Sequence, residues 1–159
     1  MKQVSPPSCL QNAFNNHHLG HVKVLEFPDG TRSAADAAAA IGCDVSDIGK
    51  SLVFMTEGNK PVLIIMNGAD RVDETKVAHL LGLDIRKADA NEVRTHTGYA
   101  IGGVPPFGHV GPVETMIDEK LLAKKIIWLA AGTPKTVFSL MPDELRAVTG
   151  VDTGVDISA

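Results

Sequence analysis

The feature that most constrains this fold is a pair of apolar runs that follow one another directly. They span Ile48–Thr56 and Lys60–Met66, and a turn signal, Glu57–Asn59, joins them. Both runs are apolar at consecutive positions, which predicts strands that are covered on both faces of a sheet. We therefore expect an antiparallel hairpin at the centre of the sheet, with other elements packed on each side of it.

Lys50 is out of place within the first of these runs. Alternate side chains of a strand share a face, so we expect Lys50 to point the same way as Ile48 and Leu52. Lysine is seldom buried without a partner. The pattern alone leaves two interpretations open: the stem lies on apolar surface with its ammonium in water, or the charge faces a pocket that uses it.

The other segments predict a mixture of helices and strands around the hairpin. Ser33 is a favourable helix N-cap, and Gly20 and Gly42 are helix-stop signals. Helices are predicted over Ser8–His18, Ala34–Ile41, Asp73–Leu81, Asn91–His96 and Pro142–Thr149, and further strands over His21–Phe27, Val113–Ile117, Ile126–Ala130 and Val137–Leu140. The two types do not alternate regularly, which predicts an α+β fold with a mixed, partly closed sheet. No linker or repeat divides residues 1–159, so we expect a single domain.

Composition limits the possible functions. Aromatic residues make up 4% of the chain and its net charge is −4, which argues against extensive stacking on nucleic acid and against a DNA-binding regulator. The two cysteines lie far apart and show no metal-binding spacing. Neither a signal peptide nor a long apolar span is present. We expect a cytoplasmic protein with no metal site, cofactor or membrane contact.

The loop Gly98–Gly111 is rich in glycine and proline. Gly102 and Gly103 leave two backbone N–H groups free of side-chain cover. Pro105 and Pro106 then stiffen the chain that follows. Such a loop can present main-chain groups to a small ligand, although a purely structural turn is the alternative. It is not a phosphate loop, because neither GxxxxGK[ST] nor a strand–GxGxxG–helix arrangement is present.

Together these stretches resemble the YbaK/ProX family, the free-standing relatives of the editing domain inserted in bacterial prolyl-tRNA synthetase. The resemblance covers most of the chain and rests on IGKSLVF at 48–54, GYAIGGVPPFGH at 98–109, TRSAADAAAAIG at 31–42 and AAGTPKTVF at 130–138. It implies a barrel-like mixed sheet flanked by helices. The family lysine falls on Lys50, and the family's Gly-x-x-x-Pro loop falls on Gly102–Pro106.

The resemblance also implies a reaction: hydrolysis, in trans, of mischarged aminoacyl-tRNA. The amino acid removed stays open among Ala, Ser, Thr, Cys, Pro and small unnatural amino acids. Backbone N–H groups of Gly102, Gly103 and Val104 are expected to stabilise the carbonyl oxygen. Lys50 is expected to serve the terminal adenosine, its phosphate or the oxyanion. No general base is visible, and a Ser51–Lys50 dyad fails because adjacent strand residues point to opposite faces. The implied mechanism uses a ribose hydroxyl of the substrate and no covalent intermediate.

The alternative function is a non-catalytic module that binds aminoacyl-tRNA or a synthetase. In either case Pro105, Pro106, His109 and Gly132 complete the set of expected pocket residues. His109 either lines the pocket or lies in solvent. Gly132 either leaves room in the pocket or simply packs. The acidic residue that the Cys-tRNA-clearing branch carries near this position is absent, so its role does not transfer.

Other candidate residues have simpler interpretations. Tyr99 is expected in the core, and His17, His18 and His21 on the surface, since no carboxylate or cysteine completes a metal site. The cations available for tRNA are Lys50, Arg71, Lys76, Arg86, Lys87, Lys124, Lys125 and Lys135. The sequence does not show which of them cluster. We expect weak, salt-sensitive tRNA binding.

Overall fold

The predicted central hairpin is confirmed. In the computed structural model, which describes residues 1–159, it consists of β3 (Ile48–Thr56) and β4 (Pro61–Asn67), paired antiparallel. The free side of β4 pairs with β6 (Glu114–Ile117). The other side of β3 pairs first with β7 (Ile127–Ala130) and, at its far end, with β5 (Ile85–Lys87). Both strands of the hairpin therefore lie inside the sheet.

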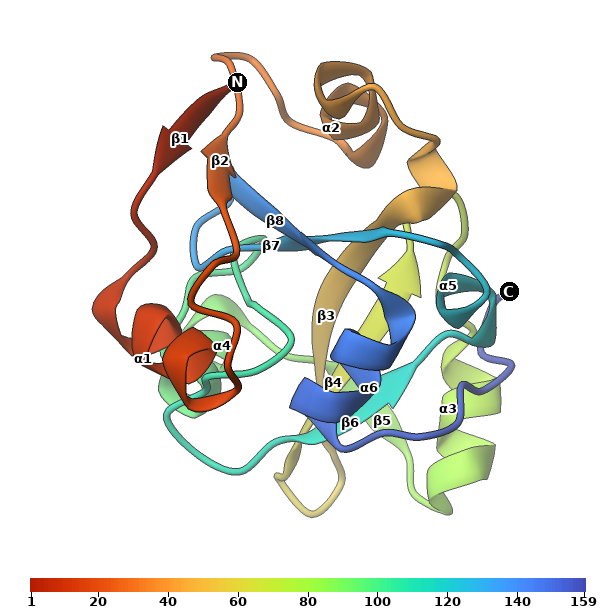
Figure 1. The fold of residues 1–159 in the computed structure, drawn as a ribbon. Helices are drawn as coiled ribbons and strands as arrows, with labels where there is room; N and C mark the ends of the chain where they lie inside the picture. The colour runs from red at the N-terminus through yellow and green to blue at the C-terminus, as the bar shows by residue number, and fades with distance from the viewer.

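The eight strands form one mixed sheet in the order β1-β2-β8-β7-β3-β4-β6, with β5 beside β3 (Figure 1). The remaining strands are β1 (Lys2–Val4), β2 (Val24–Glu26) and β8 (Thr136–Leu140). The β3–β7 and β4–β6 pairs are parallel and the other pairs are antiparallel. This arrangement confirms the α+β fold with a mixed sheet flanked by helices. The sheet is not closed through its ends, because β1 and β6 do not pair with each other.

The helices surround this sheet (Figure 1). They are α1 (Ser8–Asn16), α2 (Ala34–Ile41), α3 (Glu74–Leu81), α4 (Ala90–Thr97), α5 (Glu119–Leu122) and α6 (Pro142–Thr149), with a 3₁₀ turn at Val45–Asp47. The N-cap predicted for α2 is confirmed, since the Ser33 hydroxyl accepts from the N–H of Asp36. Gly42 ends this helix with a φ of 85°. No helix is long and apolar enough to cross a membrane.

Two predicted elements are shorter in the structure. The first helix ends at Asn16, because His18 takes a positive φ of 58° and the Leu19 N–H then closes the turn by donating to the Phe14 carbonyl at 2.7 Å. The predicted strand His21–Phe27 is limited to β2 in the structure, because only Val24–Glu26 pair with β1. The sequence also missed β1, β5 and α5, which have only three or four residues each.

The hairpin separates two apolar clusters. Val53, Leu63 and Ile65 point into the larger one, which α1 and the loop 98–111 cover with Phe14, Tyr99 and Phe107 among others. The alternate residues of both strands point into a smaller cluster that α3 covers. Coverage of both faces is the reason why both runs are apolar throughout.

Candidate active site

One edge of β3 is left without a strand partner in its middle. β7 leaves this edge at Gly49, and β5 joins it only at Phe54. The Val53 carbonyl accepts from the N–H of Ala88 on this side. Backbone groups alternate between the two edges of a strand, so the N–H and C=O of Ser51 face the same gap.

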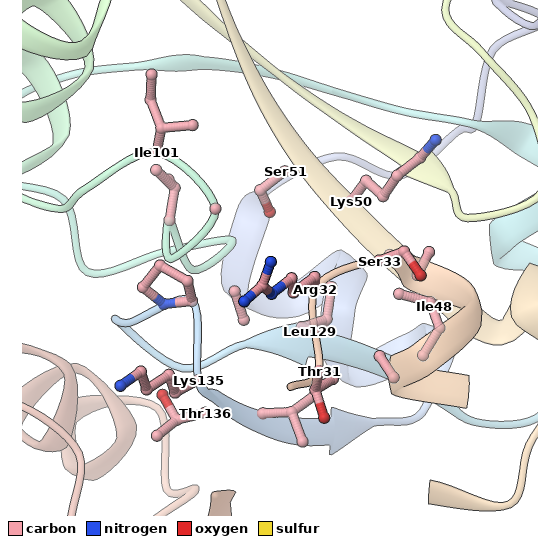
Figure 2. A pocket seen from close by; sticks show the side chains of 18 of the residues that line it. Thr31, Arg32, Ser33, Ile48, Lys50, Ser51, Ile101, Leu129, Lys135 and Thr136 are labelled. Carbon is pink, nitrogen blue, oxygen red and sulfur yellow. The ribbon is translucent and has the colours of Figure 1, made fainter. Parts of the chain in front are cut away.

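A cavity of about 900 Å³ opens along this unpaired edge (Figure 2). Every residue of β3 from 48 to 54 lines it, and successive side chains point to opposite faces. The cavity therefore extends over both faces of the strand. We call the part beside Ser51 and Val53 the inner half, and the part beside Ile48 and Lys50 the outer half. Its size is typical of small-ligand sites.

The two halves differ in their walls. The inner half is apolar and is bounded by members of the larger core cluster, namely Val53, Val93, Val104 and Leu129. The outer half is bounded by Ile48 and by the start of α2, with Ser33, Ala34 and Ala37. The small side chains of α2 let the helix approach the strand closely while leaving space at the edge.

Lys50 and Ser51 leave β3 in opposite directions (Figure 2), as strand alternation predicts. Ser51 points into the inner half, where its hydroxyl is buried and has no hydrogen-bond partner. Lys50 belongs to the cavity lining, but its ammonium lies on the far side and donates to the Asp70 carbonyl at 2.8 Å. Burial lowers the pKa of Lys50 and the charge of Arg71 lowers it further, whereas Asp70 raises it.

The loop 98–111 closes the inner half. Of the residues expected there from the sequence, Gly102 and Val104 line the cavity, whereas Gly103, Pro105 and Pro106 do not. Ile101, which the sequence did not single out, stands 55% exposed at the cavity mouth. Two of the expected contacts are thus present, and the two prolines are buried outside the cavity lining.

Gly103 is held within the loop by a backbone hydrogen bond. Its N–H donates to the Ala100 carbonyl at 3.0 Å within a turn, so it is not free for an oxyanion. A Cβ at this position would lie 2.7 Å from the Cα of Thr133. Gly103 is therefore required for the close approach of the loops that hold the two residues.

His109 and Gly132 also support the loops and do not line the cavity. The His109 ring donates from Nε2 to the Pro105 carbonyl at 2.7 Å, and burial lowers the pKa of the ring. Gly132 has a φ of 99°, and a Cβ there would lie 2.8 Å from Pro7. Tyr99 lies in the core as expected, 3% exposed.

Cations outnumber carboxylates at the cavity. Its charged lining residues are Arg32, Lys50, Lys87 and Lys135 against Asp29 alone. None of these cations is in a salt bridge; the cations that are bridged are Lys76, Arg86, Lys120, Lys124 and Arg146. The fold thus gathers three of the cations considered for tRNA, whereas the others do not line the cavity: Arg71, Lys76, Arg86, Lys124 and Lys125.

Arg32 was not singled out from the sequence. It directly precedes the N-cap of α2, which brings its guanidinium to the middle of the cavity (Figure 2). The sequence signal that could have identified Arg32 is its place as a cation directly before a predicted helix N-cap. No group of three or more His, Cys, Asp or Glu side chains is arranged to hold a metal ion.

A family model described as an aminoacyl-tRNA editing domain matches residues 28–148, which include every cavity-lining residue but Phe27. This chain belongs to the aminoacyl-tRNA editing domain family. The resemblance seen in the sequence is thereby confirmed. The cavity, the β3 edge and the two loops all lie within or beside the matched region.

The chain is also similar to proteins of known sequence or structure. It is 33% identical over 134 residues to the uncharacterized protein YwhH of Bacillus subtilis, across 84% of this chain and 85% of that protein. It is 35% identical over 97 residues to the proline–tRNA ligase of Limosilactobacillus fermentum, across 58% of this chain and 17% of the ligase. A crystal structure named as that of a candidate trans-editing enzyme for prolyl-tRNA synthetase superposes with a TM-score of 0.89 at 41% identity, covering 98% of this chain and 99% of that one.

Proposed function

We propose that this chain hydrolyses the ester bond of tRNAs mischarged with a small amino acid, in trans and in the cytoplasm. The observation that carries the proposal is the cavity at the unpaired edge of β3. It combines an apolar inner half with a lining of unbridged cations. Membership of the editing domain family supports this assignment.

The two halves suit the two ends of an aminoacyl-adenosine. The inner half, with Val53, Val104 and Leu129, would take the amino-acid side chain, because its walls are apolar. The unbridged cations of the lining would meet the phosphates of the tRNA end. Ala, Ser, Thr, Cys and Pro are the candidates, and apolar walls alone discriminate among such side chains by only about 10- to 200-fold.

Lys50 would serve the tRNA end of the substrate rather than the reacting carbonyl. Its side chain lies on the outer face of β3, opposite Ser51, and its ammonium is oriented by the Asp70 carbonyl. A charge held in this way favours a phosphate or ribose oxygen in the outer half.

The chain would contribute binding, orientation and charge rather than a nucleophile. The cavity lining contains no histidine or cysteine, and its single carboxylate, Asp29, is exposed. Activation of water would therefore fall to a ribose hydroxyl of the substrate itself. An ester that is held in place beside its water needs little more, because positioning removes much of the entropic barrier.

A deacylation panel tests this function. Ala-, Ser-, Thr-, Cys- and Pro-tRNA are incubated with the protein, and the ester that remains is followed over time. The tRNA for proline is the first to use, since related segments occur in proline–tRNA ligases. We expect at least one ester to disappear faster than in buffer. Tight binding of the same tRNAs without hydrolysis would instead establish the non-catalytic module.

A further inference from the structure

The Ser51 hydroxyl has no structural partner. Its Oγ is buried and accepts or donates no hydrogen bond within the protein. Buried polar atoms in folded proteins are nearly always hydrogen-bonded, so an exception calls for an explanation. A valine or an alanine at this position of an apolar strand would avoid the unfavourable burial.

The position of Ser51 supplies that explanation. It is the central residue of the β3 segment that lacks a neighbour, between the pairing with β7 at Gly49 and with β5 at Phe54. Its backbone N–H faces the gap, and its hydroxyl points into the inner half of the cavity (Figure 2). One residue therefore offers two hydrogen-bond donors on adjoining walls.

Negative charge is favoured at this point. Besides Lys50, whose ammonium lies across β3, the lining carries the cations Arg32, Lys87 and Lys135 against one carboxylate, and none of the three is in a salt bridge. The loop offers fewer donors than its sequence suggests, because the Gly103 N–H already bonds to Ala100. Fixed donors in a water-poor site stabilise a developing oxyanion strongly.

We propose that Ser51 is a catalytic residue that stabilises the oxyanion of the scissile ester through its hydroxyl and its N–H. This assignment rests on the deacylase function proposed above. Water adds to the ester carbon, and the carbonyl π electrons move to the oxygen that Ser51 contacts. When the C=O bond re-forms, the bond to the ribose oxygen breaks, and that oxygen takes the proton released by the water. Ser51 keeps its own proton and forms no covalent bond.

Arg32 lines the same cavity as this hydroxyl. In Figure 2 its guanidinium and the Ser51 hydroxyl are seen on the same side of β3. Arg32 is exposed and has no salt bridge, so an incoming acyl group can displace it. The displaced cation then remains near the tRNA phosphates.

Steady-state deacylation by Ser51→Ala, Ser51→Thr and the matched control Ser139→Ala tests the assignment, with the ester that wild type cleaves best. Ser139 is a partly buried strand residue outside the cavity. We expect kcat of Ser51→Ala to fall about 100-fold with little change in KM. Ser51→Thr retains a hydroxyl and should recover most of the rate. Thermal unfolding of Ser51→Ala should occur no lower than in wild type, because the hydroxyl makes no hydrogen bond in the fold.

The outcomes separate the two proposals. If wild type cleaves the ester and Ser51→Ala matches its rate, the proposed role of Ser51 is wrong, whereas the proposed deacylase function is retained. If Ser51→Ala loses rate only in proportion to a lowered unfolding temperature, the role is structural and the inference is again wrong. If wild type cleaves none of the mischarged tRNAs, both proposals fail.

Discussion

Lys50 and Ser51 are neighbours in the chain whose side chains reach different halves of one cavity. Their separation follows from strand geometry, which the sequence was sufficient to predict. Lys50 could be singled out because a charge in an apolar run is unusual. Ser51 could not, because its distinguishing property is a hydrogen bond that is missing in the fold. The residue type alone singles out Lys50, whereas Ser51 is singled out only by its surroundings in the fold.

The charge of Lys50 is predicted to act on binding. In Lys50→Met, which keeps an unbranched apolar stem, we expect kcat/KM to fall about 10- to 100-fold, the cost of one charge-assisted hydrogen bond. Most of the loss should appear as a higher KM, because Lys50 lies across β3 from the inner half. Lys125→Met is the matched control, since Lys125 is exposed and lies outside the cavity. A lower kcat at unchanged KM would place Lys50 at the carbonyl instead.

Among the elements, the site depends on where strands stop pairing. The long apolar runs predicted β3 and β4 well, because periodicity and turn residues lie within the segments themselves. β1 and β5 were missed, because three-residue strands carry little local signal and are set by their partners. The gap between β7 and β5 creates the cavity, so the central feature of the site depends on an element that no local pattern reveals.

The loop that holds Gly103 is predicted to pack rigidly against the loop that holds Thr133. Gly103→Ala would place a Cβ 2.7 Å from the Cα of Thr133, so one loop must move. We expect a decrease of about 1–3 kcal/mol in the free energy of unfolding, as for other overpacked sites. Deacylation should also slow, because Gly102 and Val104 line the cavity in the same loop.

Gly111→Ala provides the comparison for this loop variant. A Cβ at Gly111 has only the His96 carbonyl within 4 Å, at 3.8 Å. Chemical denaturation of both variants should show a clear loss of stability for Gly103→Ala and little change for Gly111→Ala. Equal stability of the two would mean that the loops are not tightly packed.

In the molecule as a whole, charge is unevenly distributed. The chain has a net charge of −4, yet its main cavity is lined by four unbridged cations. The sequence gives the net charge but does not show which cations cluster, because Arg32, Lys87 and Lys135 come from segments far apart in the chain. The family resemblance predicted a pocket, whereas the positions of its cations required the fold.

The clustered cations are predicted to set the salt dependence of tRNA binding. Replacing Arg32 and Lys135 by Gln should weaken binding and flatten the plot of log K against log salt concentration. The slope should change by about 0.7–0.9 for each phosphate that the protein no longer neutralises. Lys125→Gln removes the same kind of charge away from the cavity and should leave the slope close to that of wild type. Equal slopes for all three proteins would mean that the cations of the cavity do not bind the tRNA.

If the aminoacyl ester is cleaved inside this cavity, a bulky side chain placed there must slow the reaction. Ala130 lines the cavity, whereas Ala123 is exposed outside it. Single-turnover deacylation of the best ester from the panel should be at least about 10-fold slower in Ala130→Phe than in wild type, because the substrate must be positioned there to react. Ala123→Phe should match wild type. A wild-type rate in Ala130→Phe, with the fold intact, would mean that the ester is cleaved elsewhere.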